Sequence, residues 1–251
     1  MDNHGGRLLE AEYPNPNMNL ALDHAIAKLH TGRDPDYLTV RFWRNPSCVV
    51  LGRGQNPEEE VDMRFCRENE IAVCRRVSGG GTVYQDPGNV NVSLFLPRED
   101  ASDRIGIHGA SAELTDLLAE SLRACGVSRV ERVGPYSVFS EGKKVSGAAS
   151  YFTRTALLHH ATLLISADLS RLEGSLIHHS PPFRRGASRY SATKNLTDLP
   201  IELWERTLVG SVSEHFGAKI IPGEITAEEN ALALNLFESK YSKESWTMGA
   251  Q

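Results

Sequence analysis

The stretch that decides the fold is Arg75-Arg76-Val77-Ser78-Gly79-Gly80-Gly81-Thr82-Val83-Tyr84-Gln85-Asp86-Pro87-Gly88-Asn89-Val90-Asn91-Val92-Ser93. Three consecutive glycines cost backbone entropy and supply no side chain for packing, so a compact protein keeps them where another group approaches the main chain closely. A row of amides in such a turn forms an anion-binding concavity, and the two arginines before it add charge that suits a carboxylate or phosphate. We therefore predict a binding loop for an anionic ligand, with a glycine-rich hairpin whose polar face is solvated as the alternative.

The residues within and after the loop narrow the kind of site. The loop lacks the lysine and hydroxyl residue that end a P-loop, and it lacks G-x-G-x-x-G spacing. Directly after it, polar and apolar residues alternate, which predicts a strand whose polar face continues the site. The polar residues of this strand are Asn89, Asn91 and Ser93.

Composition limits the classes of protein to which the chain can belong. Its 251 residues, 40% of them hydrophobic, can bury one large core, and we expect a single domain over residues 1–251. A net charge of -5 and a pI near 6.0 give no basic surface for nucleic acid. No apolar run approaches the roughly 20 residues that cross a bilayer, and the first residues have no export or transit pattern. We therefore expect a cytoplasmic protein with neither nucleic-acid nor membrane partners.

The other periodic segments predict a mixture of helices and strands. Apolar residues at helical spacing predict a helix over residues 18–29, with His24 on its solvated side. Alternation predicts a half-buried strand over 37–43 and, after the turn at Asn45-Pro46, a more buried strand over 47–52; together they suggest a hairpin. Further helices are expected over about 58–69, 111–126, 202–216 and 226–240, and further strands over 129–133, 143–149 and 157–165.

A second basic motif, Lys143-Lys144, opens a strand that continues with the small residues Ser146-Gly147-Ala148-Ala149. Small residues again permit a ligand to approach closely. A lysine beside a phosphate or carboxylate stabilises the charge that develops in acyl or nucleotidyl transfer. The alternative is a pair of solvated hairpin lysines.

Three further segments carry candidate polar groups. Residues 52–57 offer Arg53 and two side-chain amides to a neighbouring site, or form a plain turn. In the strand over 157–165, His160 and Thr162 share one face and His159 the other, so the two histidines cannot ligate one metal; one lines the pocket and the other is structural. The basic segment from 178 to 195 is a cover for an anionic ligand, a docking surface for an acidic partner or a solvated loop. Its basic residues include Arg184, Arg185, Arg189 and Lys194.

Taken together, these motifs resemble the ordered motifs of lipoate-protein ligases. The resemblance rests on residues 75–91, then 142–149, then 159–164, and it extends upstream to 44–46 and 52–56 and downstream to 167–172 and 246–249. It implies an α/β (α+β) fold of the biotin/lipoate-ligase type, a mixed sheet flanked by helices. It also implies a single catalytic domain that lacks the small C-terminal accessory domain of longer ligases, as in the short archaeal or split enzymes.

The resemblance implies two reactions. Lipoate and ATP give lipoyl-AMP, and the lysine of a lipoyl-acceptor domain then takes the lipoyl group, with Mg²⁺ accompanying ATP and a separate accessory protein supplying the missing domain. By carry-over, Lys144 is the catalytic residue that touches the lipoyl carboxyl oxygen and the α-phosphate, and Asp86 is the magnesium ligand. The implied binding residues are Arg53, Arg75, Arg76, Ser78, Gly79, Gly80, Gly81, Asn89, Asn91, Gly147, Ala149, His160 and Thr162.

The sequence departs from the family pattern at two sites. Gln85 stands where the loop usually has a histidine, and Tyr136-Ser137 stands where ligases tend to have an asparagine-aspartate pair. An octanoyl or lipoyl transferase on the same fold is the main alternative, but it needs a cysteine that faces the pocket, and no cysteine follows Cys125. A non-catalytic lipoate-binding protein is the other alternative.

Overall fold

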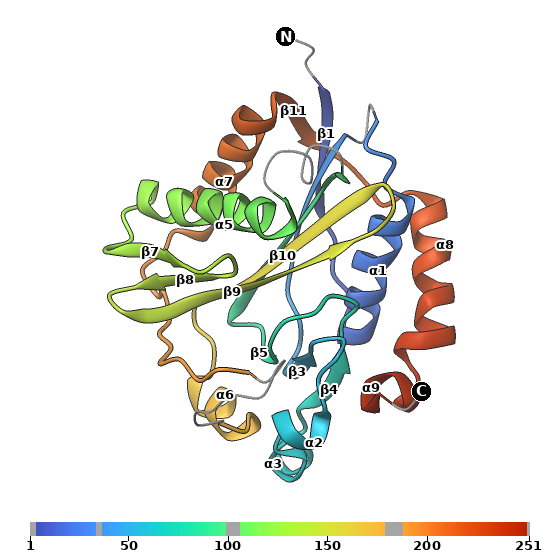
Figure 1. The fold of residues 1–251 in the computed structure, drawn as a ribbon, viewed down its shortest axis with the longest axis vertical. Coiled ribbons are helices and arrows are strands. Elements are labelled where there is room, and N and C mark those ends of the chain that lie inside the picture. Colours follow the sequence, from blue (N-terminus) through green and yellow to red (C-terminus); the bar gives the residue numbers. More distant parts are fainter. Residues whose placement is uncertain (1–3, 34–36, 99–105, 179–187, 250–251) are drawn as a thin grey trace.

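An eight-stranded mixed sheet forms the centre of the computed structural model, which describes residues 4–33, 37–98, 106–178 and 188–249 (Figure 1). The β1 strand is parallel to both of its neighbours, β11 and β2, and all other neighbouring strands of this sheet are antiparallel. In spatial order the strands are β11 (Ala218–Pro222), β1 (His4–Glu10), β2 (Leu38–Trp43), β6 (Asn89–Pro97), β10 (Ala156–Leu164), β9 (Lys143–Phe152), β8 (Ser137–Ser140) and β7 (Val130–Val133). The expected mixed sheet flanked by helices is confirmed.

Side-chain alternation gives the central strands one apolar and one polar face. In the pairing of β6 with β10, Thr162 lies opposite Asn91. Two residues along, His160 lies opposite Ser93. The intervening residues of both strands belong to the main apolar core. The polar face predicted for the strand after the glycine loop is therefore confirmed, and β10 extends it.

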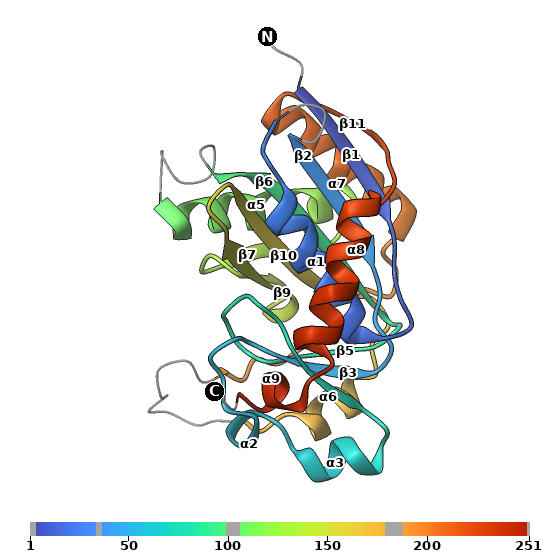
Figure 2. The ribbon, with the colours of Figure 1, turned by 90° about the vertical axis from the view of Figure 1, so that its right-hand side faces the viewer.

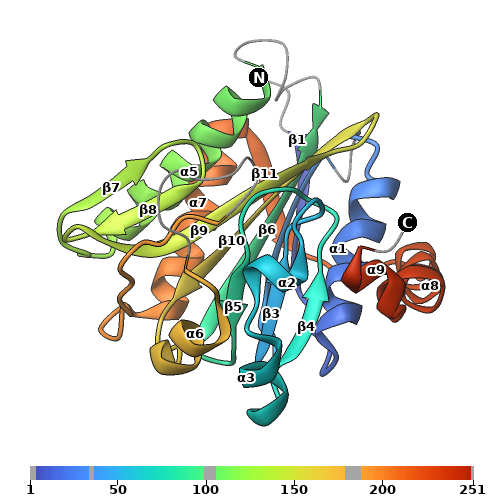
Figure 3. The ribbon, with the colours of Figure 1, turned by 60° about the horizontal axis from the view of Figure 1, so that its bottom comes forward.

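Helices α5 (Gly106–Ala124) and α7 (Ile201–Phe216) cover the apolar face of the sheet (Figure 3). The leucines that recur at helical spacing in α5 are all buried: Leu114, Leu117, Leu118 and Leu122. Trp204 of α7 is also fully buried, and its indole donates to Ser121 on α5. The two helices thus pack on each other as well as on the sheet.

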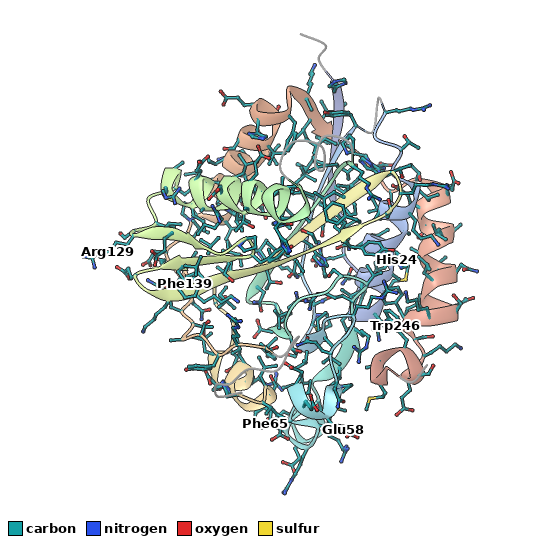
Figure 4. The ribbon with its side chains drawn as sticks, viewed as in Figure 1. His24, Glu58, Phe65, Arg129, Phe139 and Trp246 are labelled. Carbon is teal, nitrogen blue, oxygen red and sulfur yellow. The ribbon has the colours of Figure 1, made fainter. Side chains whose placement is uncertain are left out.

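The opposite face carries α1 (Pro16–Leu29), α8 (Ala227–Leu236), a π-helical turn (Phe237–Tyr241) and α9 (Glu244–Met248). A capping box formed by Thr226 and Glu229 begins α8. The prediction that His24 is solvated is wrong, because the C-terminal helices cover that side of α1 (Figure 4). The Tyr241 hydroxyl lies 3.1 Å from His24 Nδ1. Burial, with Lys240, Lys28 and Arg53 nearby, lowers the pKa of His24 to about 3.

A second, three-stranded sheet lies beside the first (Figure 2). It contains β4 (Ala72–Arg75), β3 (Cys48–Leu51) and β5 (Val83–Gln85), and it packs with α3 (Met63–Glu68) and α6 (Leu169–Ser175). The short helix α2 (Pro57–Glu60) lies between β3 and α3 in the chain. The hairpin predicted from residues 37–43 and 47–52 is therefore wrong, because the turn at Asn45-Pro46 carries the chain from one sheet to the other.

Two further expectations need correction. The helix expected over 58–69 is two short helices, since Val61 has extended backbone and bridges to Leu176, and Asp62 caps α3. The strand β2 is buried on both faces rather than half-buried, because its polar residue Arg41 forms an ion pair with Asp23 of α1. Among the described residues, no helix combines the length and apolar character that crossing a membrane requires.

Candidate functional site

A cavity of about 460 Å³ lies between the glycine loop and the polar face of the large sheet. The loop joins β4 to β5, so it belongs to the small sheet, while the floor comes from β6, β9 and β10 of the large one. The site is therefore built at the junction of the two sheets. Sequence-predicted residues that line it are Arg76, Gly80, Gly81, Asn91, Lys144, Gly147, Ala149, His160 and Thr162.

A second cavity of about 110 Å³ adjoins the first. Both are lined by Lys144, Gly147 and Thr162, so the two cavities meet at the lysine. The far part of the smaller cavity is mostly apolar and is lined by Leu164, Leu172, Leu176, Ile177 and Tyr190. The inner end of the larger one reaches Leu20, Trp43 and Val50.

Lys144 is the charged group at this junction. Its ammonium has no hydrogen-bond or ion-pair partner among the described residues. Gly147 keeps space for it, because a Cβ there would lie 3.3 Å from Lys144 Cε. Burial and the nearby Arg76 lower the pKa of Lys144 from its usual value. A free, partly desolvated cation of this kind attracts an anion strongly.

Arg76 holds the glycine loop from inside. Its guanidinium donates to the carbonyls of Gly79 (2.6 Å) and Gly81 (2.8 Å), and to Val50 O across the small sheet (3.0 Å). Its Nε donates to Ser78 Oγ at 3.0 Å. Burial lowers the pKa of Arg76 to about 10, so the side chain stays a cation at neutral pH. The loop is thus fixed around a positive charge.

The glycines of the loop are required by close approach. Gly80 has φ +85°, the left-handed region that glycine adopts without strain. A Cβ at Gly52 would lie 2.1 Å from Gly80 O, so the end of β3 must be glycine for the loop to pack there. Hydrogen bonds from Arg53 N to Ser78 O (2.8 Å) and from Arg76 N to Leu51 O (3.0 Å) keep the two segments together.

His160 connects the loop to α1. Its Nε2 lies 2.6 Å from Ser78 Oγ, and its Nδ1 lies 3.5 Å from Asp23 Oδ2. Asp23 is buried, and it pairs with Arg41 and accepts the hydroxyl of Ser93. Ser78 is itself buried and does not line either cavity.

A network of amides forms the floor of the larger cavity. Gln85 Nε2 donates to Asn91 Oδ1 (2.7 Å) and to Thr162 Oγ1 (2.6 Å). The Gln85 oxygen accepts from Asn45. Asn91 Nδ2 is buried without a partner, so it is a free donor at the cavity wall. The glutamine that departs from the family pattern is thus a bridging member of the floor.

Six of the predicted residues line neither cavity: Ser78, described above, Asp86, described below, and the four that follow. Gly79 lines neither, although its carbonyl is held by Arg76. The Arg75 guanidinium is surrounded by the main-chain carbonyls of Gly52, Arg53, Gln55, Trp246 and Thr247. The Arg53 side chain is exposed outside the cavities. Asn89 accepts the backbone N–H of Asp86 and lies below the loop.

Both carboxylate oxygens of Asp86 accept backbone hydrogen bonds. One of its carboxylate oxygens accepts Gly88 N at 2.7 Å and the other accepts Asp168 N at 2.8 Å. It lines neither cavity. No cluster of three histidine, cysteine or carboxylate residues that could hold a metal ion occurs within the described ranges. In this structure Asp86 orders the turn before β6, and its role as a magnesium ligand stays a prediction.

The described end of the basic segment covers both cavities. Ser188 Oγ accepts from Thr82 N (2.8 Å) and Gln55 Nε2 (3.1 Å), and Ser188 N donates to the buried carboxylate of Glu60. Farther along, Lys144 N donates to Ala192 O at 2.8 Å. Lys194 pairs with Glu141 on the outer surface. Arg184 and Arg185 lie outside the described residues.

Sequence reasoning missed several residues of the site. Asp23 and Ser188 are among them, as are Val133 and Phe139 of the β7–β8 hairpin, which line the larger cavity together with Tyr136. Figure 4 labels Phe139 on this hairpin. Asp23 had a signal, because a carboxylate within a helix and an arginine within the apolar strand β2 suggest a buried pair. Ser188 had none.

A family model described as the lipoyl protein ligase A/B catalytic domain matches residues 15–219. Three solved structures resemble the chain over nearly its whole length. One, from Thermoplasma acidophilum, concerns a bi-partite lipoate protein ligase and its E2 lipoyl domain; it is 32% identical, with a TM-score of 0.85, and the match covers 99% of this chain and 98% of that one.

The second, also from Thermoplasma acidophilum, is described as a putative lipoate protein ligase with bound lipoic acid. It is 31% identical, with a TM-score of 0.83 over 98% of this chain and all of that chain (100%). The third is a lipoate-protein ligase A bound with ATP, 32% identical with a TM-score of 0.83 over the same shares, 98% and 100%. The two ligands of these relatives are an acyl carboxylate and a nucleoside triphosphate, both anionic.

Proposed function

The chain belongs to the lipoyl protein ligase A/B catalytic-domain family, and we propose that it is a lipoate-protein ligase that forms lipoyl-AMP from lipoate and ATP and passes the lipoyl group to a lysine of an acceptor domain. The family indicated by the sequence motifs is confirmed. The observation that carries the proposal is the free ammonium of Lys144 at the meeting point of two cavities.

The two cavities suit the two halves of an acyl-adenylate. The larger one extends from Lys144 to an apolar end at Leu20 and Trp43, which suits the acyl chain and its ring. The smaller one is mostly apolar and opens beside Thr162, which suits the nucleoside. The carboxyl and phosphate groups that become joined then lie at the junction, within reach of Lys144.

In the first step a carboxylate oxygen of lipoate attacks the α-phosphorus of ATP. The new bond joins acyl oxygen to phosphorus, and the bond from phosphorus to the pyrophosphate oxygen breaks. Lys144 holds the two anions together and balances the charge at the α-phosphate, while Arg76 adds a fixed positive charge beneath the glycine loop. Positioning and electrostatic stabilisation are the main catalytic contributions in such transfers.

In the second step the neutral amine of the acceptor lysine attacks the acyl carbon. An amide bond forms, the acyl–oxygen bond to AMP breaks, and the amine loses one proton to solvent. Lys144 now stabilises negative charge on the acyl oxygen and on the departing phosphate. The Ser188 segment and the glycine loop shield the mixed anhydride from water before the acceptor arrives.

Two partners belong to the proposal. The acceptor is a lipoyl domain, by analogy with the E2 lipoyl domain studied with the bi-partite relative. A second protein that assists adenylation is the other, by analogy with the two parts of that ligase. A transferase with a cysteine nucleophile is less consistent with the structure, since none of the four cysteines lines either cavity.

The decisive experiment measures the intact mass of a purified apo lipoyl domain after incubation with the protein. Parallel arms supply lipoate with ATP and magnesium, preformed lipoyl-AMP, or octanoyl-carrier protein. Modification in the first arm, or from lipoyl-AMP alone, supports the proposal and tells whether a second protein is needed for adenylation. Modification from the carrier protein alone would replace the ligase by a transferase.

A further inference from the structure

A continuous chain of buried polar contacts runs from α1 to the glycine loop. It begins at Asp23, passes through His160 and Ser78, and ends at Arg76. Asp23, Ser78 and Arg76 are each buried, and His160 has a side-chain exposure of 10%. The chain therefore links a carboxylate outside the cavities to the arginine that holds the loop.

The hydrogen-bonding capacity of Arg76 fixes the first bond of this chain, and the tautomer of His160 sets the direction of the next. The Arg76 Nε can only donate, so Ser78 Oγ accepts from it at 3.0 Å. The serine hydroxyl then has one hydrogen to donate, and His160 Nε2 lies 2.6 Å away. When that hydrogen points at Nε2, a neutral His160 carries its proton on Nδ1, the nitrogen that faces Asp23 Oδ2.

The surroundings of Asp23 keep it charged. Burial alone would raise its pKa, but Arg41, together with hydrogen bonds from His160 and Ser93, holds the pKa of Asp23 below its usual value. Arg41 is bound in turn, because it also donates to the carbonyls of Ala11 and Asn19. The carboxylate is thus a fixed acceptor beside Nδ1.

We propose that Asp23 is a positioning residue of the ligase reaction, which selects the Nδ1–H tautomer of His160 and so orients Ser78 as the acceptor for Arg76. This proposal rests on the proposed function. Without the carboxylate, the ring proton moves to Nε2 and points at Ser78 Oγ. The serine hydrogen must then turn away from the ring, the Arg76–Ser78 contact weakens, and the loop over the reacting groups loses its fixed position.

The test replaces Asp23 with asparagine, which keeps the size of the side chain and removes its charge. The matched control is Glu229→Gln, because Glu229 also forms a buried ion pair, with Arg7, and lines neither cavity. The nitrogen chemical shifts of ¹⁵N-labelled histidine report which ring nitrogen of His160 carries the proton. Acceptor modification from preformed lipoyl-AMP gives kcat and KM.

We expect D23N to move the His160 proton to Nε2 and to lower kcat about 10- to 100-fold with a smaller change in KM, since a misplaced catalytic group costs about this much. The control E229Q should leave the tautomer and kcat as in the wild type. Combining D23N with Ser78→Ala should lower kcat little beyond either change alone, because both act through one chain of contacts.

Three results would overturn the proposal: an unchanged tautomer in folded D23N, a loss of kcat shared by E229Q, or effects of D23N and S78A that multiply. If D23N does not fold, S78A alone decides, since it should keep the Nδ1–H tautomer yet lower kcat to a similar degree. The tautomer measurement needs no activity, so it tests the chain of contacts even if the wild type modifies no acceptor.

Discussion

Two pairs of adjacent identical residues show how residues that line the larger cavity differ from neighbours that pack in the scaffold. Arg75 and Arg76 follow each other at the end of β4, and His159 and His160 follow each other in β10. In each pair the second residue lines the larger cavity and the first does not. Because successive side chains of a strand point to opposite faces, neighbours of the same type acquire different roles.

The first residue of each pair, Arg75 or His159, uses its side-chain nitrogens in contacts within the protein. Every nitrogen of the Arg75 guanidinium donates to main-chain carbonyls. His159 lies 2.9 Å from Ser150 Oγ and 3.4 Å from Thr115 Oγ1, and its burial lowers its pKa to about 3. The comparison teaches that the residue types in the sequence indicate where the site lies. The contacts in the structure then show which residue of each pair faces the cavity.

Among the residues that line the cavities, Lys144 gives the strongest test, by the substitution Lys144→Ala. We expect the rate of acceptor modification from lipoyl-AMP to fall 100-fold or more, on the order of removing a pre-positioned oxyanion donor, while the melting temperature stays close to that of the wild type. The neighbouring Lys143→Ala is the control, because Lys143 is exposed. Equal losses for the two lysines would contradict the assignment.

Replacing Arg75 and Arg76 in turn with methionine should separate a structural role from a role in the site. Arg76→Met is expected to lower kcat/KM about 100-fold, because the loop loses its central charge and its fixed position. Arg75→Met should instead lower the free energy of unfolding by about 2–3 kcal/mol, because buried carbonyls lose their donors. Urea unfolding and single-turnover kinetics on both variants check this. A catalytic defect in R75M at full stability would place Arg75 at the ligand.

Gly52→Ala tests whether the loop depends on its contact with β3. The added methyl would overlap Gly80 O, so the loop must shift, and we expect kcat/KM to fall about tenfold. Gly54→Ala is the matched control, because a Cβ at Gly54 would meet no atom within 4 Å. Similar kinetics for the two variants would show that the loop position does not limit the reaction.

The smallest expected effect is on the free energy of unfolding at acid pH. The folded-state pKa of His159, about 3, lies below the ordinary 6.5, so the unfolded chain binds the proton more readily and stability falls as pH falls from about 6.5 towards 3. Between pH 7.5 and 5.5 this amounts to about 1 kcal/mol. Urea unfolding of His159→Gln should show a correspondingly flatter decline, with pH 7.5 as the internal reference. An unchanged slope would remove His159 as its source.

Local periodicity was enough to predict the polar floor of the site. The alternation in β6 and β10 placed Asn91, His160 and Thr162 on one face, and the structure brings them together. The small residues after Lys144 correctly indicated that its strand lies close to a site. These predictions succeeded because they depend only on residues near each other in sequence.

The errors arose where distant segments decide the outcome. The acceptors of Arg75 include carbonyls 171 and 172 residues away, which no local pattern reveals. His24 is buried by Tyr241, which follows 217 positions later. The turn at Asn45-Pro46 has the form of a hairpin turn, yet it leads into a second sheet. Strands β1 and β11, which pair with each other across the length of the chain, were not predicted at all.

The contact between Arg75 and the segment at Trp246 also has a consequence for biosynthesis. A ribosome adds about 5–20 residues per second, so the 171 positions that separate the two residues take roughly 10–30 s to translate. Throughout that interval Arg75, which precedes the glycine loop, lacks two of its hydrogen-bond acceptors, the carbonyls of Trp246 and Thr247. The ligand site therefore matures only after residues 246 and 247 have left the exit tunnel, and the growing polypeptide remains catalytically immature until then.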